Sequence, residues 1–408
     1  MSQAPKVLLI VTQDTKEQEA RFVRGVLEAA GCRVIHLDPS VRRTVGGAEI
    51  SPEAVVAAAG QTIEAVRALG HEGKCQAVMI EGSVKLALAT HATEHLSGVL
   101  SIGGSMGTSL AGAVMQALPY GLPKMIVSTM ASGFTAPYVG HKDIAMMNAV
   151  TDVAGLNSIS RDVYRNAANA VAGMAKGYAP STSGDRPLIL MGTLGTTETA
   201  TRRIREALER DGNEVMVFHT SGAGGPTMDS IVADRDVAAM LDLSWTEIVD
   251  QIYGGIAAGG PERGRAALIR GVPTIFAPGN IDFIIAGPID DAQARYPGKR
   301  YHIHNPALTA VRTELPELQA VADQMADLVK DARGPVRFFV PLKGFSNHDS
   351  PAGHIHDPSL PGPFAAYLRS KVRPDIPVTA LDHHFNDPEF ADAIVAATRA
   401  MIAERRPA

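Results

Sequence analysis

The stretch Gly98-Val-Leu-Ser-Ile-Gly-Gly-Ser-Met-Gly-Thr-Ser-Leu110 decides the fold of this chain. A short apolar run leads into a glycine loop and then into residues of helical spacing, which predicts a buried strand running directly into a helix. Such a loop suits a bulky anion, because glycines allow close backbone approach and free N–H groups of the helix point toward the anion. The alternative is a tight turn whose glycines serve only the packing of helix on sheet. We predict a phosphate-binding loop made of Gly103, Gly104, Ser105, Met106, Gly107, Thr108 and Ser109.

The loop contains no lysine. This excludes a Walker A loop, which requires Gly-Lys-Ser/Thr, and the glycine spacing also departs from the strict G-x-G-x-x-G dinucleotide fingerprint. The positive charge must therefore come from elsewhere. Lys16 is the first candidate, because it closely follows a strand-length apolar run at residues 7–11. Asp14 or Thr15 is equally suited to cap the helix that begins there.

Apolar runs of strand length alternate with helical patterns through the first half of the chain. This alternation predicts a parallel sheet, whose ligand crevice lies outside the carboxyl ends of its strands. The loop at residues 128–134 is expected in the same crevice, with Asp143 as a further polar partner. The predicted strands are 7–11, 33–37, 98–102 and 124–128; the predicted helices are 16–30, 52–69, 74–96 and the segment that buries Leu110, Ala113, Val114 and Ala117.

The first strand–helix–strand unit recurs later in the chain. At a constant offset of 181 residues, Val7 falls on Leu188, Gly31 on Gly212 and Val34 on Val215 without a gap. The fold predicted is α/β, with two Rossmann-like three-layer domains, each with a mainly parallel sheet. A polar segment places the break near residue 182, giving domains at 1–180 and 186–408. Glycine loops at 192–198 and 220–226 suggest a second anion site, with ordinary strand-to-helix turns as the alternative.

Composition limits the classes of partner. The chain has 408 residues, 45% of them hydrophobic and 20% charged, and a net charge of −5, so neither nucleic acid nor a membrane surface is expected as a partner. Its two cysteines, Cys32 and Cys75, cannot form a disulfide framework and fit a reducing compartment. The apolar run after Lys6 is too short for a signal peptide. We therefore expect a cytoplasmic protein.

Histidines are dense near the C-terminal end. His302 and His304 alternate along an extended segment and should share a face, as should His354 and His356. His91-Ala-Thr-Glu-His95 matches the H-x-x-E-H pattern of inverted zinc peptidases, but a helix end with imidazolium charge near the C-terminal dipole is the simpler interpretation. We interpret the C-terminal histidines as solvated loop residues and assign no metal ligand. The histidines from residue 302 onward are His302, His304, His348, His354, His356, His383 and His384, with Asp349, Asp357, Asp382 and Asp387 nearby.

Several motifs coincide in order along nearly the whole chain. With them, the chain resembles an uncharacterised bacterial family similar to the N-terminal ATP-binding domain of a plant tobamovirus-resistance protein. The motifs are Asp14-Thr-Lys16, Gly103-Gly-Ser-Met-Gly-Thr-Ser109, Pro123-Lys124 with Ser128-Thr129, Ala131-Ser-Gly133, Phe218-His219 with Gly222-Ala-Gly-Gly225, His304-Asn305, Pro341-Leu-Lys-Gly344 and His383-His-Phe-Asn-Asp-Pro-Glu-Phe390.

The resemblance implies ATP in the first domain and a homodimer. The chain departs from the family at Met106, where the family usually has glycine, and at Lys74, which stands where the family tends to have arginine. Lysine supplies the charge but not a bidentate fork. The nucleotide pocket that the resemblance implies consists of Lys16, Asp38, Ser40, Lys74, the Gly103 to Ser109 loop, Ala131, Ser132 and Gly133.

We expect an ATP-binding protein of small-molecule metabolism, with ATP, and Mg²⁺ where it is required, on the first domain and a small-molecule substrate toward the second. His304, His383 and His384 are the candidate catalytic residues. Two alternatives remain open. One is a dimeric, nucleotide-responsive binding module without catalysis, and the other is a metal-dependent hydrolase or lyase that uses the second-domain histidines.

Overall fold

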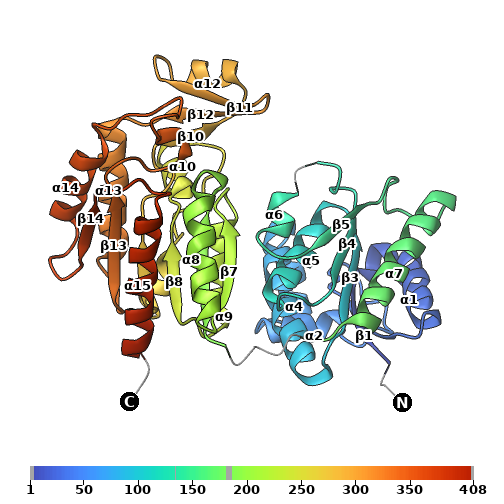
Figure 1. Ribbon diagram of the computed structural model, residues 1–408. Coiled ribbons are helices and arrows are strands. Elements are labelled where there is room, and N and C mark those ends of the chain that lie inside the picture. The colour runs from blue at the N-terminus through green and yellow to red at the C-terminus, as the bar shows by residue number, and fades with distance from the viewer. Residues whose placement is uncertain (1–3, 134, 181–185, 406–408) are drawn as a thin grey trace. The chain divides into compact units, whose positions relative to one another are not determined.

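The computed structural model describes residues 4–133, 135–180 and 186–405, and the chain divides into two compact units, Met1–Thr182 and Ser183–Ala408 (Figure 1). Each unit is built around a parallel sheet with helices on both faces. The predicted α/β class with two Rossmann-like domains is thus confirmed. The break predicted near residue 182 lies outside the described residues.

The first unit is a five-stranded parallel sheet in the order β2-β1-β3-β4-β5. The order reverses between β1 and β3, which makes this the point where neighbouring crossover helices leave for opposite faces and where a doubly wound sheet binds its ligand. The strands are β1 (Lys6–Ile10), β2 (Arg33–Leu37), β3 (Gly98–Gly103), β4 (Lys124–Ser128) and β5 (Ala145–Asn148).

Two apolar layers sandwich this sheet. One contains side chains of α1 and α7, and the other contains side chains of α2, α3, α4 and α5. Alternate residues of β1 enter opposite layers, Leu9 the first and Leu8 the second, as the period of two in a strand requires. The helices are α1 (Gln13–Ala29), α2 (Pro52–Ala58), α3 (Ile63–Ala68), α4 (Glu72–Glu94), α5 (Ser105–Ala117), α6 (Ala136–Val139) and α7 (Ser158–Gly177).

Two sequence predictions for these helices need correction. The helix predicted at 52–69 is two helices, because Gly60 adopts a φ of +73° that ends the first one. In α5, Ala117 is exposed and Ala113 is half-buried, whereas Ala111 and Met115 are buried beside Leu110 and Val114. The buried stripe therefore lies about one residue away from the predicted one.

The second unit has a six-stranded parallel sheet in the order β14-β13-β9-β8-β6-β7, which repeats the reversal of the first unit between β6 and β8. Helices α8 and α15 cover one face, and α10, α13 and α14 cover the other. The strands are β6 (Leu188–Thr193), β7 (Glu214–His219), β8 (Ala239–Asp242), β9 (Thr274–Phe276), β13 (Val336–Pro341) and β14 (Val378–Leu381). The helices are α8 (Glu198–Arg210), α9 (Gly224–Asp234), α10 (Thr246–Tyr253), α11 (Arg265–Ile269), α12 (Ile289–Arg295), α13 (Leu315–Val329), α14 (Pro361–Lys371) and α15 (Pro388–Arg405), with short 3-10 turns η1 (Gly195–Thr197) and η2 (Asn347–Asp349).

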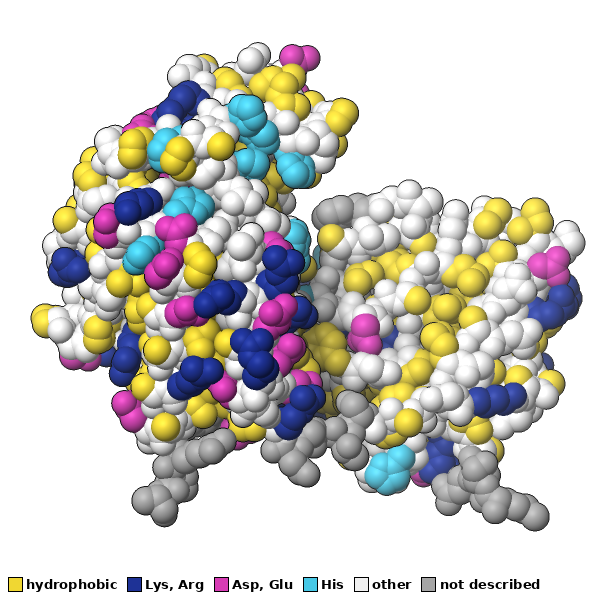
Figure 2. All heavy atoms as spheres, in the orientation of Figure 1, with side chains coloured by type: hydrophobic (Ala, Val, Ile, Leu, Met, Phe, Trp, Pro, Cys, Tyr) yellow, Lys and Arg dark blue, Asp and Glu magenta, His cyan; other side chains and the backbone are white. Residues whose placement is uncertain are grey.

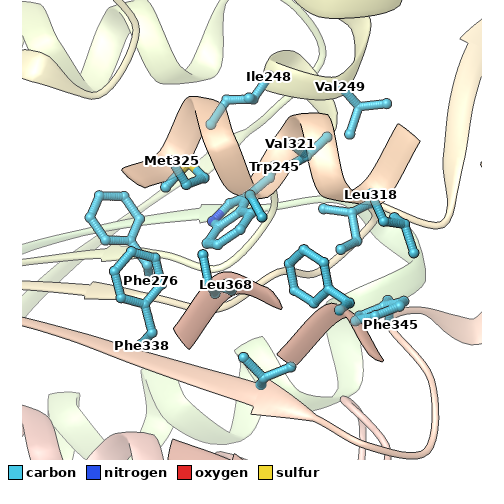
Figure 3. Packing of buried hydrophobic residues seen from close by; sticks show 14 of the residues in the cluster. Trp245, Ile248, Val249, Phe276, Leu318, Val321, Met325, Phe338, Phe345 and Leu368 are labelled. Atoms are coloured by element: carbon cyan, nitrogen blue, oxygen red, sulfur yellow. The ribbon is translucent and has the colours of Figure 1, made fainter. Parts of the chain in front are cut away.

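Aromatic packing marks the core on the α13 face (Figure 3). The indole of Trp245 is fully buried and meets the rings of Phe276 and Phe338 edge-on, with centroids 6.1 and 5.9 Å away, while these two phenylalanines stack at 5.2 Å. Edge-to-face and offset-stacked contacts of this kind are the preferred ones for aromatic rings. Because Trp245 is the only tryptophan of the sequence, its fluorescence reports on this core alone.

A three-stranded antiparallel sheet is inserted in the second unit in the order β10-β12-β11. The sequence analysis predicted an extended segment at His302 and His304, but it also interpreted the C-terminal histidines as solvated loop residues. For His302 and His304 that interpretation is wrong, because both lie in the strand β11. The register shifts between Ile303 and Asn305, so that a β-bulge lies at His304. The strands are β10 (Phe283–Ala286), β11 (Tyr301–Asn305) and β12 (Leu308–Arg312).

The predicted repeat is recognisable in both units. Gly31 and Gly212 each follow the end of the first helix with left-handed φ angles of +84° and +87°. The ungapped offset is wrong by one residue, however. Val7 pairs with Val34, whereas Leu188 pairs with Glu214 rather than Val215, so the connection in the second unit is one residue shorter. No helix in the described part of the chain is both long and apolar enough to span a membrane.

Candidate functional site

A cavity of about 480 Å³ opens at the switch point of the first sheet, between the ends of β1 and β3. Its size falls within the ~300–1,000 Å³ of typical ligand pockets. The loops after β1, β2 and β3 and the first turns of α4 meet there. The lining residues are Ile10, Val11, Thr12, Asp14, Thr15, Lys16, Pro39, Val41, Arg42, Gly70, His71, Glu72, Cys75, Gln76, Met79, Ile102, Gly104, Ser105, Met106, Gly107 and Leu110.

The glycine loop and the N-terminus of α5 form one wall. The cap residue of α5 is Gly104, and no side chain caps this helix end, so the N–H groups of its first turn have no partner within the helix. The Gln76 side chain donates to the carbonyl of Met106 at 3.1 Å and ties α4 to the loop. The wall therefore offers backbone donors and a helix dipole of the sign that attracts an anion.

The glycines of this loop serve two different purposes. None of Gly103, Gly104 and Gly107 has a positive φ, so the loop does not require glycine for its backbone conformation. A Cβ on Gly103 would lie 3.0 Å from the Cα of Gly107, which shows that this glycine is needed for the close packing of α5 on β3. A Cβ on Gly104 or Gly107 would meet nothing closer than 3.9 Å. These two glycines leave room on the cavity side.

Lys16 also lines the cavity, as predicted from its position after β1. Its backbone departs from the helix, with φ of −134° and ψ of 36°, and kinks α1 after its first turn. The ammonium donates to Thr15 Oγ1 at 3.2 Å, and no carboxylate of the described residues pairs with it. An ammonium without a carboxylate partner suits an anionic ligand.

Asp38 and Ser40 do not line the cavity, although the resemblance placed them in the pocket. Both are fully buried and cap α1 instead: Asp38 Oδ1 accepts from the Gln13 N–H at 3.0 Å, and Ser40 Oγ accepts from the Asp14 N–H at 3.0 Å. Burial raises the pKa of Asp38 above its ordinary value, although hydrogen bonds from Ser40 and Gln13 oppose this shift. Their role is to fix the loop that carries Lys16.

The second cation of the cavity is Arg42, not Lys74. Arg42 lines the cavity, and its N–H donates to Asp14 Oδ2 at 3.0 Å. Lys74 is exposed and lies outside the lining, whereas Glu72, Cys75, Gln76 and Met79 of the same helix line the cavity. The sequence analysis missed Arg42, although its place after β2 was a usable signal.

The remaining residues predicted for the pocket are absent from the lining. The hydroxyl of Thr108 is buried and bonded to Gly104 O at 2.8 Å and to Ser128 Oγ at 2.6 Å, which ties α5 to the end of β4. Gly103, Ser109, Ala131, Ser132 and Gly133 do not line the cavity either. Asp143 forms an ion pair with buried Lys124 at 2.7 Å, and residue 134 lies outside the described residues.

At His91 and His95 the structure confirms a helix end. α4 stops at Glu94, and His95 caps it with a left-handed φ of 55°. Burial, with His95 and Lys124 nearby, lowers the pKa of His91, which disfavours the imidazolium form expected from the sequence.

In the second unit, the loop at 220–226 is filled by protein groups. The N–H groups of Gly222 and Gly225 donate to Glu247, whose buried carboxylate pairs with Arg263 Nε at 3.0 Å. In the loop at 192–198, Thr197 Oγ1 accepts from the Leu194 N–H at 3.4 Å and donates to the Leu194 carbonyl at 2.9 Å. The donors of the 220–226 loop are thus engaged by Glu247, which favours the alternative of a structural turn there.

The histidines of the second unit separate into groups. His302, His304 and His348 lie together, with one nitrogen of each within 4.8 Å of the others, so the shared face of His302 and His304 is confirmed. His354 and His356 do not share a face: His354 stacks on His302 with centroids 5.0 Å apart, whereas His356 Nδ1 contacts the carbonyl of Asp349 at 2.8 Å. Burial and the neighbouring histidines lower the pKa of His348 to about 4.

His383 and His384 lie outside this group, although they were predicted as candidates together with His304. The ring nitrogens of His384 are engaged by the Ser346 carbonyl at 2.9 Å and the Asn386 N–H at 3.1 Å, so this ring fixes the local loop. His383 is half-exposed, with Nδ1 3.9 Å from Asp387 Oδ2. The sequence analysis could not associate His348 with His302, because His302 lies in β11 of the small sheet and His348 lies in η2 after β13, far along the chain.

Comparison with known proteins identifies relatives over the whole chain. The N-terminal domain of the uncharacterised protein family UPF0261 matches residues 5–180, and its C-terminal domain matches residues 186–402. The UPF0261 protein of Clostridium tetani is 34% identical over 95% of this chain and 97% of its own length, and that of Mesorhizobium japonicum is 34% identical over 96% and 98%. The ToMV resistance protein Tm-1(GCR237) of Solanum lycopersicum is 29% identical over 97% of this chain and 55% of its own.

Proposed function

The chain belongs to the uncharacterised protein family UPF0261, and we propose that its first unit binds ATP in the cavity at the β1–β3 switch point. The observation that carries the proposal is the meeting of two wall elements on one cavity: the uncapped N-terminus of α5 and the unpaired ammonium of Lys16. Each attracts an anion independently, and together they suit a chain of phosphates.

Two cationic side chains of the lining favour phosphates, although the carboxylates of Asp14 and Glu72 also belong to it. Lys16 and Arg42 contribute two positive charges, and Arg42 is only weakly held by Glu72, 3.8 Å away with both side chains largely exposed. An exposed pair of this kind contributes little and can exchange partners. We therefore assign the phosphates to the space between Lys16, Arg42 and the glycine loop.

The cavity lining also contains apolar side chains. They are those of Val11, Val41, Met79, Ile102 and Leu110. Apolar walls with a few placed polar groups are typical of small-molecule sites. We assign the adenine ring to these apolar side chains.

Asp14 is the carboxylate that we assign to Mg²⁺. It lines the cavity beside Lys16, and one of its oxygens accepts the Arg42 N–H, which fixes the orientation of the group. Mg²⁺ in nucleotide sites is usually held by one or two carboxylates and by the phosphates. Asp14→Asn is therefore expected to weaken ATP binding in the presence of Mg²⁺ more than in its absence.

A metabolic enzyme also needs side chains that act on its substrate. We assign this role to His302, His304 and His348 of the second unit, which we call the histidine group. The same proposal includes the homodimer that the family resemblance implies. It also includes a cytoplasmic location, which the two free cysteines favour. A nucleotide-responsive dimer without catalysis would differ by showing a change of oligomer and no turnover.

The proposal is tested by titrating purified, tag-free protein with ATP, ADP and adenosine by calorimetry, with and without Mg²⁺. The affinity should fall in that order, because each lost phosphate removes contacts to Lys16, Arg42 and α5. The proposal would be overturned if ATP did not bind at about millimolar concentration, which corresponds to a binding free energy weaker than about 4.1 kcal/mol. Equal affinity for adenosine would show that the phosphates are not bound here.

A further inference from the structure

The histidine group of the second unit lies between the edge of the small antiparallel sheet and the loop after β13. His302 and His304 belong to β11, and His348 belongs to η2. Figure 2 shows histidine side chains gathered on this part of the unit, over β10, β11 and β12. We propose that His302, His304 and His348 form a binding site for a divalent transition-metal ion of the zinc class.

The three rings have free ligand atoms. Throughout the described ranges, no hydrogen bond engages the ring nitrogens of His302, His304 or His348. Histidines with a structural role in this chain differ: His36 contacts Gln13 and the Val11 carbonyl at 3.2 and 2.9 Å, and His384 is bonded at both nitrogens. The ring nitrogens of the three imidazoles therefore converge and are available as ligands.

The backbone around β11 directs two of the rings to one point. His302 pairs with Ala310 of β12, and the register shift between Ile303 and Asn305 leaves His304 without a paired residue on β12. Bulges commonly re-aim a side chain beside a functional site. The ligand atoms of both histidines lie within 4.8 Å of each other and of His348.

A buried ion pair fixes the loop that carries His348. The guanidinium of Arg312, at the end of β12, lies 3.2 Å from Asp349 Oδ1, and both side chains are fully buried. Asp349 also accepts the N–H groups of Phe345 and Asp357, at 3.2 and 2.9 Å. The two sequence-distant halves of the group are thereby held together before any ion binds, as a preorganised metal site requires.

The neighbouring rings complete the surroundings. The ring of Phe283 meets that of His348 at 5.5 Å, and the ring of His302 lies between His348 at 4.2 Å and His354 at 5.0 Å. His354 is exposed and is not one of the three converging ligands, so its stacking positions His302 rather than completing the coordination.

The donor set selects the ion. Three imidazoles, with no carboxylate in the group, suit Zn²⁺, Co²⁺, Ni²⁺ or Cu²⁺ and not Mg²⁺ or Ca²⁺, which prefer oxygen ligands. Three protein ligands also leave a fourth position of a tetrahedral ion for water or for an oxygen of a substrate, which is the arrangement of catalytic zinc sites. The ligand class predicted for this position is therefore a small oxygen donor.

The test uses the full-length chain with its affinity tag removed, because a histidine tag binds the same ions. After dialysis against a chelator, the protein is titrated with Co²⁺, followed by its visible d–d absorption, and with Zn²⁺ by competition. We expect one equivalent to bind, and we expect Zn²⁺ to raise the midpoint of the thermal unfolding detected by Trp245, since a ligand that binds only the native state stabilises it.

Three variants and a matched control decide the assignment. His302→Ala, His304→Ala and His348→Ala should each lower the affinity for Zn²⁺ by about 100-fold or more, because losing a direct ligand costs at least as much as losing an outer-shell partner. His383→Ala, a half-exposed histidine of the same unit outside the group, should leave the affinity unchanged. Far-UV circular dichroism identifies any variant that fails to fold.

Stoichiometric binding that survives all three substitutions would overturn the site, as would the absence of Co²⁺ absorption in the native chain. An equal loss in His383→Ala would place the ion elsewhere. The result is independent of ATP binding by the first unit, because neither titration contains a nucleotide.

Discussion

Gly103 and Gly107 approach one another so closely that a Cβ on Gly103 would lie 3.0 Å from the Cα of Gly107, whereas a Cβ on Gly107 would meet nothing closer than the Ile102 carbonyl at 3.9 Å. The same loop therefore contains one glycine required by packing and another that the fold does not need. This asymmetry separates the two interpretations of the loop, since a ligand would explain the second glycine and helix packing would explain only the first.

Alanine substitutions exploit this asymmetry. Gly103→Ala should lower the free energy of unfolding of the first unit by about 1–3 kcal/mol, because the methyl group overpacks a backbone contact. Gly107→Ala should leave stability unchanged or raise it by up to about 1 kcal/mol, since alanine favours the helix, while ATP affinity falls. Urea titration followed by circular dichroism gives the first quantity, and calorimetry gives the second. A Gly107→Ala variant with normal ATP affinity would leave packing as the only purpose of the loop.

Met106 projects from the first turn of α5 into the same cavity and is 45% exposed. Met106→Gly should fold and bind ATP more tightly, by up to about tenfold or 1.4 kcal/mol, because the side chain occupies space beside the phosphates. Met106→Ala removes most of the side chain while keeping helix propensity, so it separates steric effects from backbone effects. Unchanged or weaker binding in both variants would mean that the phosphates lie elsewhere in the cavity.

How far the sequence predicts the site can be seen at Lys16 and Lys74. The position of Lys16 in the cavity lining follows from the sequence, because the carboxyl end of a parallel strand has a fixed location in the sheet. Lys74 lies outside the lining, because the resemblance that indicates this lysine does not specify its position around the helix. Glu72, Cys75, Gln76 and Met79 follow the spacing of one helix face and line the cavity, so Lys74 necessarily points away from it.

The histidine group could not be predicted in the same way. The alternation of His302 and His304 is a local pattern and was recognised, but His348 reaches them only through the inserted sheet and the Arg312–Asp349 pair. Apolar periodicity predicts which segments form strands and helices. It contains no information on which loop crosses to a second sheet, since that contact depends on buried polar partners distant in the sequence.

Removing the charge of Asp349 tests the buried pair directly. Asp349→Asn should destabilise the second unit by about 3 kcal/mol or more, because Arg312 is left buried without its main counter-ion. The exposed pair of Arg203 and Asp392 is the matched control, and Asp392→Asn should cost at most about 1 kcal/mol. Urea unfolding followed by Trp245 fluorescence reports on this unit. Equal effects of the two substitutions would contradict the assigned role of the pair.

Asp250 should make the stability of the second unit depend on pH. Its carboxylate accepts the N–H groups of Ile285 and Ala257, at 3.0 and 2.9 Å, but burial raises its pKa from 3.8 to about 7. Between these values the native state binds more protons than the unfolded state, so the free energy of unfolding falls as pH rises, by up to about 1.4 kcal/mol per pH unit.

In Asp250→Asn this contribution to the slope disappears, while that of Asp229, whose pKa burial raises to about 6, remains. The measurement is the difference between the wild-type and Asp250→Asn slopes, obtained from urea unfolding followed by Trp245 fluorescence. Parallel pH profiles for the two proteins would show that Asp250 is ionised normally in the native state.

The most direct test of the central claim is the affinity of the Lys16→Ala and Lys74→Ala variants for ATP, measured by calorimetry in the same buffer. Lys16 lies in the cavity wall without a carboxylate partner among the described residues, whereas Lys74 is exposed on the same unit and outside the lining. We predict that Lys16→Ala lowers the affinity about 10- to 100-fold, the value of a charge-assisted contact, and that Lys74→Ala leaves it within about twofold. Equal losses in the two variants, or an unchanged affinity in Lys16→Ala, would contradict a nucleotide bound at the switch point of the first sheet.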